Sequence, residues 1–341
     1  MKITRRVNLL ATYCLLVFFV MFSAAVKADY SEHPSAQPFI ARMVEQHDFD
    51  SFELTQLFKA VEKKQSILDT IARPAEKTKS WADYRKIFIK PARIEGGVSF
   101  WLDNAEALLR AERAFGVPAE YIVAIIGVET LYGKITGSYR VMDALSTLAF
   151  DYPPRSPFFT KELEHYLLLT REHGQDPLLN KGSYAGAMGL GQFMPSSYRE
   201  YAVDFNGDSW PDIWQNKADA IGSVANYFHR HGWQAAQRVT VRARPNKNIV
   251  LAEPKTIAKP ELTVADWMQR GLQPVIDLNE DVLANAIVLD GALGDEYWLT
   301  MNNFYVITRY NRSAMYAMAV DQLAQAIYRE GFDKVEEKLN P

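Results

Sequence analysis

The chain has 341 residues, and its 38 lysine and arginine side chains nearly balance its 41 aspartates and glutamates, giving a net charge of −3. Hydrophobic residues make up 48% and charged residues 23% of the sequence, a globular composition that excludes a disordered or fibrous chain. The length is enough for two or three lobes around a large core. Because the charges nearly cancel, we expect no general attraction to nucleic acid, and any polymer must bind through a local groove.

The first 28 residues have the features of an export signal. Three basic residues, Lys2, Arg5 and Arg6, precede an apolar stretch over 9–25, and small residues at positions 26 and 28 suit cleavage before residue 29. An uncleaved membrane anchor stays open as the alternative, because the stretch approaches the length that spans a bilayer. All four charged residues of this segment are basic, so cleavage leaves 34 basic against 41 acidic side chains, a charge of −7.

The only cysteine, Cys14, lies early in that apolar stretch. A lipid-accepting cysteine follows the apolar run instead, so we expect no lipid anchor. The mature chain therefore has no disulfide, no thiol nucleophile and no cysteine-ligated metal site.

The pattern from about 36 to 116 is helical. Ser51 is a candidate N-cap for a helix that turns Leu54 and Leu57 inward. A second helix is expected over 105–115, ended by Gly116. Pro118 then suits the first position of a helix that runs to about Tyr132 and ends at Gly133. Because this helix is apolar nearly all round, it should be central and buried.

Further helices are expected over 158–172 and 218–231, separated by a glycine-rich segment at 181–193 and a polar loop at 204–215. The composition then changes. Short strand-like runs at 239–244, 249–251, 286–289 and 296–299 predict a small β-containing lobe. A last helix capped by Ser313 should bury Tyr316, Val320, Leu323 and Ile327 on one face.

Glu129 is the most informative side chain in the sequence. It lies near the end of the apolar helix, on the face of Ile125 and Tyr121. We expect burial to raise its pKa and to keep it protonated near neutral pH, as a group that protonates a glycosidic oxygen requires. A structural glutamate held by backbone N–H groups or an arginine is the open alternative.

The run from Ser183 to Pro195 is the second informative feature, with small residues that let the backbone approach a ligand closely. It lacks the Gly-Lys-Ser/Thr of a phosphate-binding loop, and its helical flanks do not suit a dinucleotide site. Its amides and carbonyls, beside Gln192, suit sugar hydroxyls and N-acetyl groups. A tight helix contact through small residues is the alternative.

Four motifs occur together: Val128-Glu129-Thr130 with Tyr132-Gly133, the run 185–197 (AGAMGLGQFMPSS), the loop 204–214, and 221–228 (IGSVANYF). In this order they resemble the membrane-bound lytic transglycosylase B family, over most of residues 35–330. The resemblance implies a mainly α (α+β) fold: a lysozyme-like helical core with a flanking α lobe and a small β-containing lobe. It also implies cleavage of the β-1,4 bond between N-acetylmuramic acid and N-acetylglucosamine in peptidoglycan, leaving a 1,6-anhydro end.

The residue chemistry agrees with such a reaction. A glycosidase with two carboxylates needs its second one roughly 5–9.5 Å from the acid. The segments expected near Glu129 offer only Glu200 and Asp204, at their fringe. A single acid/base suffices if the C6 hydroxyl of the substrate closes on C1, with help from the 2-acetamido group, and no water is consumed.

The resemblance also implies binding roles for residues at matching positions. These are Ser183 and Gln192 near the −1 sugar, Tyr227, Tyr310 and Asn311 near Glu129, and Tyr84 and Arg155 on saccharide or peptide stem. Taken alone, each tyrosine also fits core packing. Pro154 and Phe158 depart from the family pattern, where an arginine and a tyrosine are expected, which leaves the details of stem or sugar binding open.

The loop 204–215 is typical of an EF-hand-like cation site. The candidate ligands for a structural Ca²⁺ or Na⁺ are Asp204, Asn206, Asp208, the carbonyl of Trp210, and Asp212. Gln215 stands where the last acidic ligand is expected, so Asp212 is the candidate substitute. A turn without metal is the alternative. The chemistry itself needs no cofactor, and the histidines form no zinc site.

We therefore expect a periplasmic, monomeric lytic transglycosylase acting on glycan strands, with cell-wall synthesis or hydrolysis proteins as possible partners. The expected parts are a signal peptide (1–28), an α lobe (29–108, completed by 313–341), the catalytic core (109–234) and the β-containing lobe (235–312). A muramidase that uses water and a non-catalytic peptidoglycan-binding scaffold are the two rival functions.

Overall fold

The computed structural model describes residues 29–72, 79–246, 249, 251 and 257–340. The predicted export signal and Cys14 lie outside these residues. Among the helices that the structure describes, none combines the length and the apolar character needed to cross a bilayer. The fold is mainly helical, as predicted, and its described strands form a five-stranded and a two-stranded antiparallel sheet.

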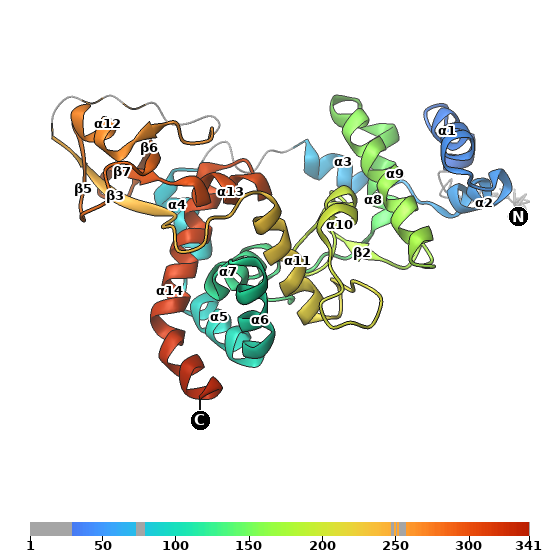
Figure 1. The fold of residues 1–341 in the computed structure, drawn as a ribbon. Helices are drawn as coiled ribbons and strands as arrows, with labels where there is room; N and C mark the ends of the chain where they lie inside the picture. Colours follow the sequence, from blue (N-terminus) through green and yellow to red (C-terminus); the bar gives the residue numbers. More distant parts are fainter. Residues whose placement is uncertain (1–28, 73–78, 247–248, 250, 252–256, 341) are drawn as a thin grey trace, which may run out of the picture.

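Short helices open the chain and pack at one end of the molecule (Figure 1). They are η1 (Tyr30–Glu32), α1 (Gln37–His47), α2 (Ser51–Ala60) and α3 (Gln65–Ile71). The prediction that Ser51 caps α2 was wrong by one residue. The carboxylate of Asp50 accepts from the Glu53 N–H at 2.8 Å, and Ser51 is the first helical residue.

A second set of helices surrounds the centre of the molecule. It comprises α4 (Trp81–Phe88), α5 (Pro91–Asp103), α6 (Ala105–Phe115), α7 (Ala119–Thr130) and the long C-terminal α14 (Ala314–Leu339). Helix α7 contacts α5, α6, α11 and α14, and eight of its twelve residues are buried. The prediction of a central, buried helix is confirmed.

The ends of α7 differ from the prediction. Pro118 is its N-cap and has an extended backbone, so Ala119 is the first helical residue. The helix ends at Thr130, because Leu131 takes a left-handed conformation (φ 52°) two residues before the predicted stop at Gly133. The cap N–H of Leu131 donates back to the carbonyl of Gly127.

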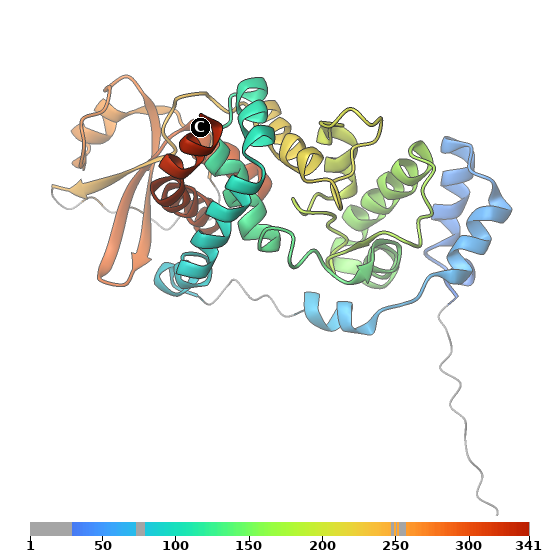
Figure 2. The same cartoon turned by 90° about the horizontal axis from the view of Figure 1, so that it is seen from below.

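The middle of the chain forms the layer between the two ends (Figures 1 and 2). Its elements are β1 (Tyr139–Arg140), α8 (Val141–Asp151), η2 (Pro153–Arg155), α9 (Ser156–Glu172), β2 (Lys181–Gly182), α10 (Pro195–Tyr201) and α11 (Lys217–Arg230). The first helices pack on α8, since Phe39 and Phe58 both contact the ring of Phe150.

The opposite end is the β-containing lobe, whose five strands pair antiparallel in the order β4-β6-β7-β3-β5. Its elements are β3 (Thr240–Pro245), β4 (Leu262–Thr263), α12 (Val264–Gln269), β5 (Leu272–Pro274), β6 (Leu283–Gly291), β7 (Gly294–Thr300) and α13 (Asn302–Tyr310). The predicted strand at 249–251 was wrong for Ile249 and Leu251, which lie in no strand; residue 250 is outside the described residues.

The last helix was predicted correctly. The Ser313 side chain accepts from the Tyr316 N–H, and the four residues expected on its inner face are buried. Because α14 packs on both α5 and α7, this helix holds the C-terminal part of the chain against the centre of the molecule.

Candidate active site

A cleft of about 370 Å³ lies where the C-terminal end of α7 meets the glycine-rich run. Glu129, on the last turn of α7, is half-buried in its wall. The binding residues predicted to lie near it also line this cleft: Ser183, Gln192, Tyr227, Tyr310 and Asn311. Sequence positions up to 182 apart are thus brought to one surface.

Thr130 fixes the end of α7 to the glycine-rich run. Its buried hydroxyl donates to the carbonyl of Leu190 at 2.9 Å and accepts from the backbone N–H of Gly133 at 3.0 Å. The backbone at Glu129 is thereby held against the opposite wall, which limits the positions its carboxyl group can reach.

The glycine-rich run is a tight hairpin. Met188 and Phe193 exchange both backbone hydrogen bonds, at 2.8 and 2.9 Å. Gly189 is required in its turn, since its φ is 68° and an added Cβ would lie 2.5 Å from the carbonyl oxygen of Ile213. The run therefore uses its small residues for close backbone approach, as the sequence suggested.

Ser183 and Gln192 are held by the same hairpin. The Ser183 Oγ accepts from the N–H groups of Ala185 and Ala187, at 3.3 and 3.0 Å, so its hydroxyl proton stays available to another acceptor. Gln192 has a left-handed backbone (φ 52°), and its Nε2 donates to the carbonyls of Thr136 and Gly189, at 3.1 and 2.9 Å. Its amide oxygen can then accept from a ligand.

Two tyrosine hydroxyls surround the carboxyl group of Glu129. Tyr316, buried on α14, donates to the Glu129 Oε1 at 2.5 Å. Tyr310, at the end of α13, donates to the carbonyl of Gly191 at 2.5 Å. Burial holds the pKa of both hydroxyls well above the usual range, and Glu129 raises it further whenever its carboxyl group is ionised, so both remain donors.

Tyr227 completes this wall from α11. Its ring stacks on His231 at 4.0 Å and meets Tyr310 edge-on at 4.7 Å, and its hydroxyl donates to the carbonyl of Arg309 at 2.7 Å. Phe193 packs beside both tyrosines. The wall is aromatic and has fixed polar groups, a combination that suits the apolar faces and hydroxyls of sugar rings.

The two other predicted binding residues do not line the cleft. Tyr84 is 4% exposed on α4 and packs against Trp81 and Phe88. Arg155 is exposed on η2, with its guanidinium 4.6 Å from the ring centre of Phe158.

Of the described residues that line the cleft, Glu129 alone has a carboxyl group. Glu200 and Asp204, the other carboxylates expected nearby, are not among them. The arrangement therefore offers one proton-transferring carboxyl group together with neutral hydroxyl donors.

Sequence reasoning missed the contact between Tyr316 and Glu129. It placed Tyr316 on the buried face of the last helix but gave its hydroxyl no partner. A tyrosine on an otherwise aliphatic face was the available signal, because a buried hydroxyl requires a hydrogen-bond partner.

The polar loop 204–215 brings three carboxylates together. Oxygens of Asp204, Asp208 and Asp219 lie within 4.8 Å of one another. Asp219 was not predicted, because it lies beyond the loop, in the first turn of α11. Burial raises the pKa of Asp219, and the nearby charge of Asp204 adds to that effect.

The other predicted ligands have different contacts. Asp212 is not in this cluster: its Oδ1 accepts from the N–H groups of Trp214 and Gln215, at 2.9 and 3.0 Å, and so shapes the next turn. The Trp210 carbonyl accepts from the Asp212 N–H, and Asn206 donates its side-chain N–H to Asp208. The carboxylate cluster therefore contains Asp219 and lacks Asp212, whereas the ligand set predicted from the sequence contained Asp212.

The sequence also matches known proteins over most of its length. Residues 31–325 match the model of the Transglycosylase SLT domain. The chain is 44% identical over 308 residues to the membrane-bound lytic murein transglycosylase B of Escherichia coli K12, covering 88% of this chain and 84% of that protein.

Solved structures agree with the sequence match. The catenated lytic transglycosylase SltB1 of Pseudomonas aeruginosa is 53% identical, with a TM-score of 0.84, over 89% of this chain and all of that one. The E. coli lytic transglycosylase Slt35 in complex with calcium is 43% identical, with a TM-score of 0.81, over 89% of this chain and 96% of that one.

Proposed function

The chain belongs to the membrane-bound lytic murein transglycosylase B family and is a lytic transglycosylase that acts on peptidoglycan, and from this premise we propose that Glu129 is its sole catalytic acid/base. We propose that it cleaves the β-1,4 bond between N-acetylmuramic acid and N-acetylglucosamine. The single observation that supports the assignment is that Glu129 is the one carboxyl group on the described lining of the cleft.

The reaction needs one group that changes its protonation state twice. Glu129 first gives its proton to the leaving glycosidic oxygen, and Tyr316 stabilises the carboxylate that forms, because its hydroxyl donates to Oε1. That carboxylate then takes the proton from the C6 hydroxyl as this oxygen closes on C1. The bond to the leaving sugar breaks, the 1,6-anhydro bond forms, and no water is consumed. The 2-acetamido group of the substrate assists at the positive anomeric carbon.

The walls of the cleft are proposed to hold the sugars. Ser183 has a hydroxyl proton to donate, Gln192 an amide oxygen to accept, and Tyr227, Tyr310 and Asn311 border Glu129. Tyr84 is buried and lies outside the lining of this cleft, so we assign it no direct contact with the sugar near Glu129. Arg155 is exposed outside the cleft and is proposed to contact more distant parts of the polymer.

A structural Ca²⁺ is proposed in the loop 204–215, held by Asp204, Asp208 and Asp219. Three carboxylates within 4.8 Å repel one another, and a divalent cation removes that repulsion. Slt35 was crystallised with calcium, which supports the choice of ion. Because Asp219 begins α11, the ion would fix the helix that presents Tyr227 and would take no part in proton transfer.

We also propose that the protein works in the periplasm as a monomer, after export by residues 1–28. The exported chain then acts on the far side of the membrane that it crosses, and the glycan strands of peptidoglycan are its macromolecular partner.

The test is the product released from peptidoglycan by wild type, Glu129→Gln and the control Glu200→Gln, whose carboxyl group is exposed outside the cleft. Glu129→Gln should lower turnover by roughly 10²- to 10⁴-fold while the affinity for a chitooligosaccharide persists. Mass spectrometry should find anhydro ends, lighter by one water than reducing ends. Reducing ends from wild type would favour the muramidase. Lytic activity of the preparation that Glu129→Gln leaves unchanged would come from another protein and would favour the non-catalytic scaffold.

A further inference from the structure

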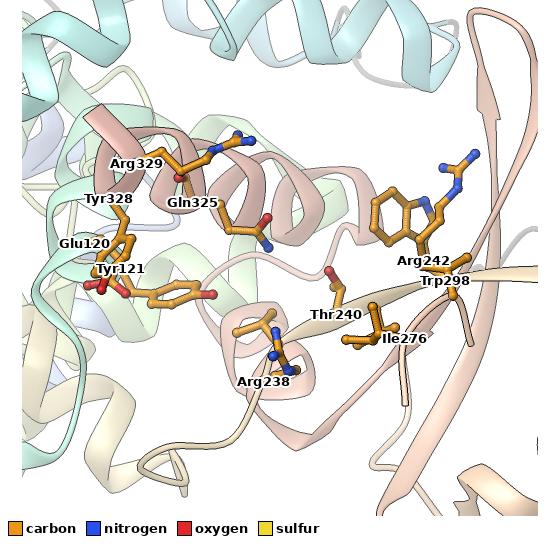
Figure 3. A pocket seen from close by; sticks show the side chains of 13 residues that line it. Glu120, Tyr121, Arg238, Thr240, Arg242, Ile276, Trp298, Gln325, Tyr328 and Arg329 are labelled. Atoms are coloured by element: carbon orange, nitrogen blue, oxygen red, sulfur yellow. The ribbon is translucent and has the colours of Figure 1, made fainter. Parts of the chain in front are cut away.

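A second cavity, of about 470 Å³, lies between the sheet of the β-containing lobe and α14 (Figure 3). It shares no lining residue with the cleft of Glu129. We call it the α14 groove and define it by Arg238, Arg242, Trp298, Gln325, Tyr328 and Arg329. It continues into a neighbouring cavity of about 350 Å³ that shares four of these residues and adds Arg85. Volumes in this range accommodate small ligands and short peptides.

The charge of the groove is mainly positive. Arg238 and Arg329 are exposed, and neither makes an ion pair with any residue that the structure describes. Arg242 pairs with Glu296 at 2.8 Å and covers the ring of Trp298. Three acidic side chains oppose this charge: Glu296, which Arg242 neutralises, Glu120, whose pKa burial raises to about 7, and Asp321 beneath the groove, whose pKa burial also raises. Two guanidinium groups without an ion pair suit a ligand with carboxylates, and within the described residues only the Nε of Arg329 is already used, in a hydrogen bond to the carbonyl of Gln325 at 3.2 Å.

The groove also offers apolar surface and a hydrogen-bond donor. Val275, Ile276 and Tyr328 border it with exposed fractions of 41, 42 and 40%. The indole Nε1–H of Trp298 is buried and has no hydrogen-bond partner within the described parts of the chain. A buried N–H without a partner is unusual and is suited to an incoming carbonyl oxygen. Carboxylates, carbonyls and small apolar side chains occur together in peptides.

The floor of the groove is rigid. The fully buried carboxylate of Asp321 accepts from the hydroxyls of Tyr121 and Thr240, at 2.8 and 2.6 Å, and from Gln325 Nε2 at 3.0 Å. These contacts join α7, β3 and α14 beneath the groove. A floor fixed before binding lowers the entropy that binding costs.

We propose that the α14 groove is a second binding site for peptidoglycan, which takes the carboxylate-bearing peptide stems, separate from the cleft that takes the glycan. The proposal rests on the function proposed above, because that function supplies a polymer with such stems. Tyr121 beneath the groove and Glu129 in the cleft are eight residues apart on α7, roughly 12 Å along its axis. One meshwork can therefore occupy both sites, and the groove would hold stems while a strand is cleaved.

The binding experiment uses the full chain with Glu129→Gln, so that nothing is cleaved, and calorimetry with free stem peptide released from peptidoglycan by an amidase. Arg238→Gln/Arg329→Gln in this background should raise the dissociation constant at least tenfold, and converting the carboxylates of the peptide to amides should have a similar effect. The matched control Lys59→Gln/Lys161→Gln removes two exposed charges outside the groove and should leave the affinity unchanged. Thermal unfolding of each variant verifies the fold.

Equal affinity of the groove variant and its background for the stem peptide would overturn the proposal, as would competition by a chitooligosaccharide, which would place the peptide in the cleft. Binding of polyglutamate without binding of stem peptide would overturn it in favour of an acidic protein segment. With Glu129 intact, the groove variant should release anhydro ends from peptide-free glycan within twofold of the wild-type rate. Absence of anhydro ends from wild type would contradict the proposed function itself, independently of the groove.

Discussion

Replacing Tyr316 by phenylalanine should slow catalysis without unfolding the protein. The substitution removes one oxygen, which donates to the Glu129 Oε1 at 2.5 Å, and leaves the buried ring in place. A hydrogen bond to a charged group contributes about 1.5–3 kcal/mol. Since Glu129 becomes a carboxylate as the glycosidic bond breaks, this energy is lost mainly in the transition state. A loss of that size lowers kcat roughly 10- to 150-fold.

The assay is release of anhydro ends from peptide-free glycan at saturating concentration, so that kcat is read directly. Tyr166→Phe is the matched control, because Tyr166 is equally buried and its hydroxyl donates to the carbonyl of Pro177 at 2.7 Å, outside the cleft. Both variants should lose about 0.5–1.5 kcal/mol of stability. Only Tyr316→Phe should lose activity. A kcat within twofold of wild type for Tyr316→Phe would refute the role given to this hydroxyl.

Two further predictions concern stability. Burial raises the pKa of Glu120 from 4.5 to about 7, so its ionisation destabilises the fold, and stability falls as the pH rises through that interval. Glu120→Gln should therefore be more stable than wild type by about 1–3 kcal/mol at pH 8 and equal to it at pH 4, as measured by urea unfolding; an equal gain at both pH values would contradict the cause. Calcium at a hundredfold excess over its dissociation constant should stabilise wild type by about 2.7 kcal/mol in thermal unfolding. Asp219→Asn should abolish this stabilisation and Asp212→Asn should retain it. Loss of the stabilisation in Asp212→Asn but not in Asp219→Asn would instead favour Asp212 as the ligand, as expected from the sequence.

Elements with strong local signals could be predicted from the sequence. The helix over 105–115 ends at Gly116, which has a left-handed backbone at its C-cap, and the last helix begins at its Ser313 cap. Local signals fail where a neighbouring residue can do the same task. Asp50 and Ser51 are both good N-caps, and the structure uses the aspartate. The run at 249–251 has the composition of a strand, but Ile249 and Leu251 pair with no strand.

The parts of the site that sequence reasoning missed depend on contacts between distant residues. Tyr316 and Glu129 are 187 positions apart, and only the packing of α14 on α7 brings them together. Asp219 joins Asp204 because the loop folds back on the first turn of α11, where Asp219 accepts from the N–H groups of Phe205 and Asn206. Counting positions along a twelve-residue loop cannot find a carboxylate that joins the cluster from the following helix.

Because the described lining of the cleft has a single carboxyl group, its walls should influence which product forms, an anhydro end or a reducing end, as well as the rate. A glycosidase with two carboxylates carries its nucleophile or base within the protein. Where the described lining offers only Glu129, the group that closes on C1 must come from the substrate or from water. The C6 hydroxyl wins this competition only if the sugar is held with that oxygen over C1 while water is excluded. The wall beside Glu129 is built by Tyr227 from α11 and Tyr310 from α13 against the hairpin at Gly191. If this wall holds the sugar, as proposed above, the choice of product depends on how these separate elements pack.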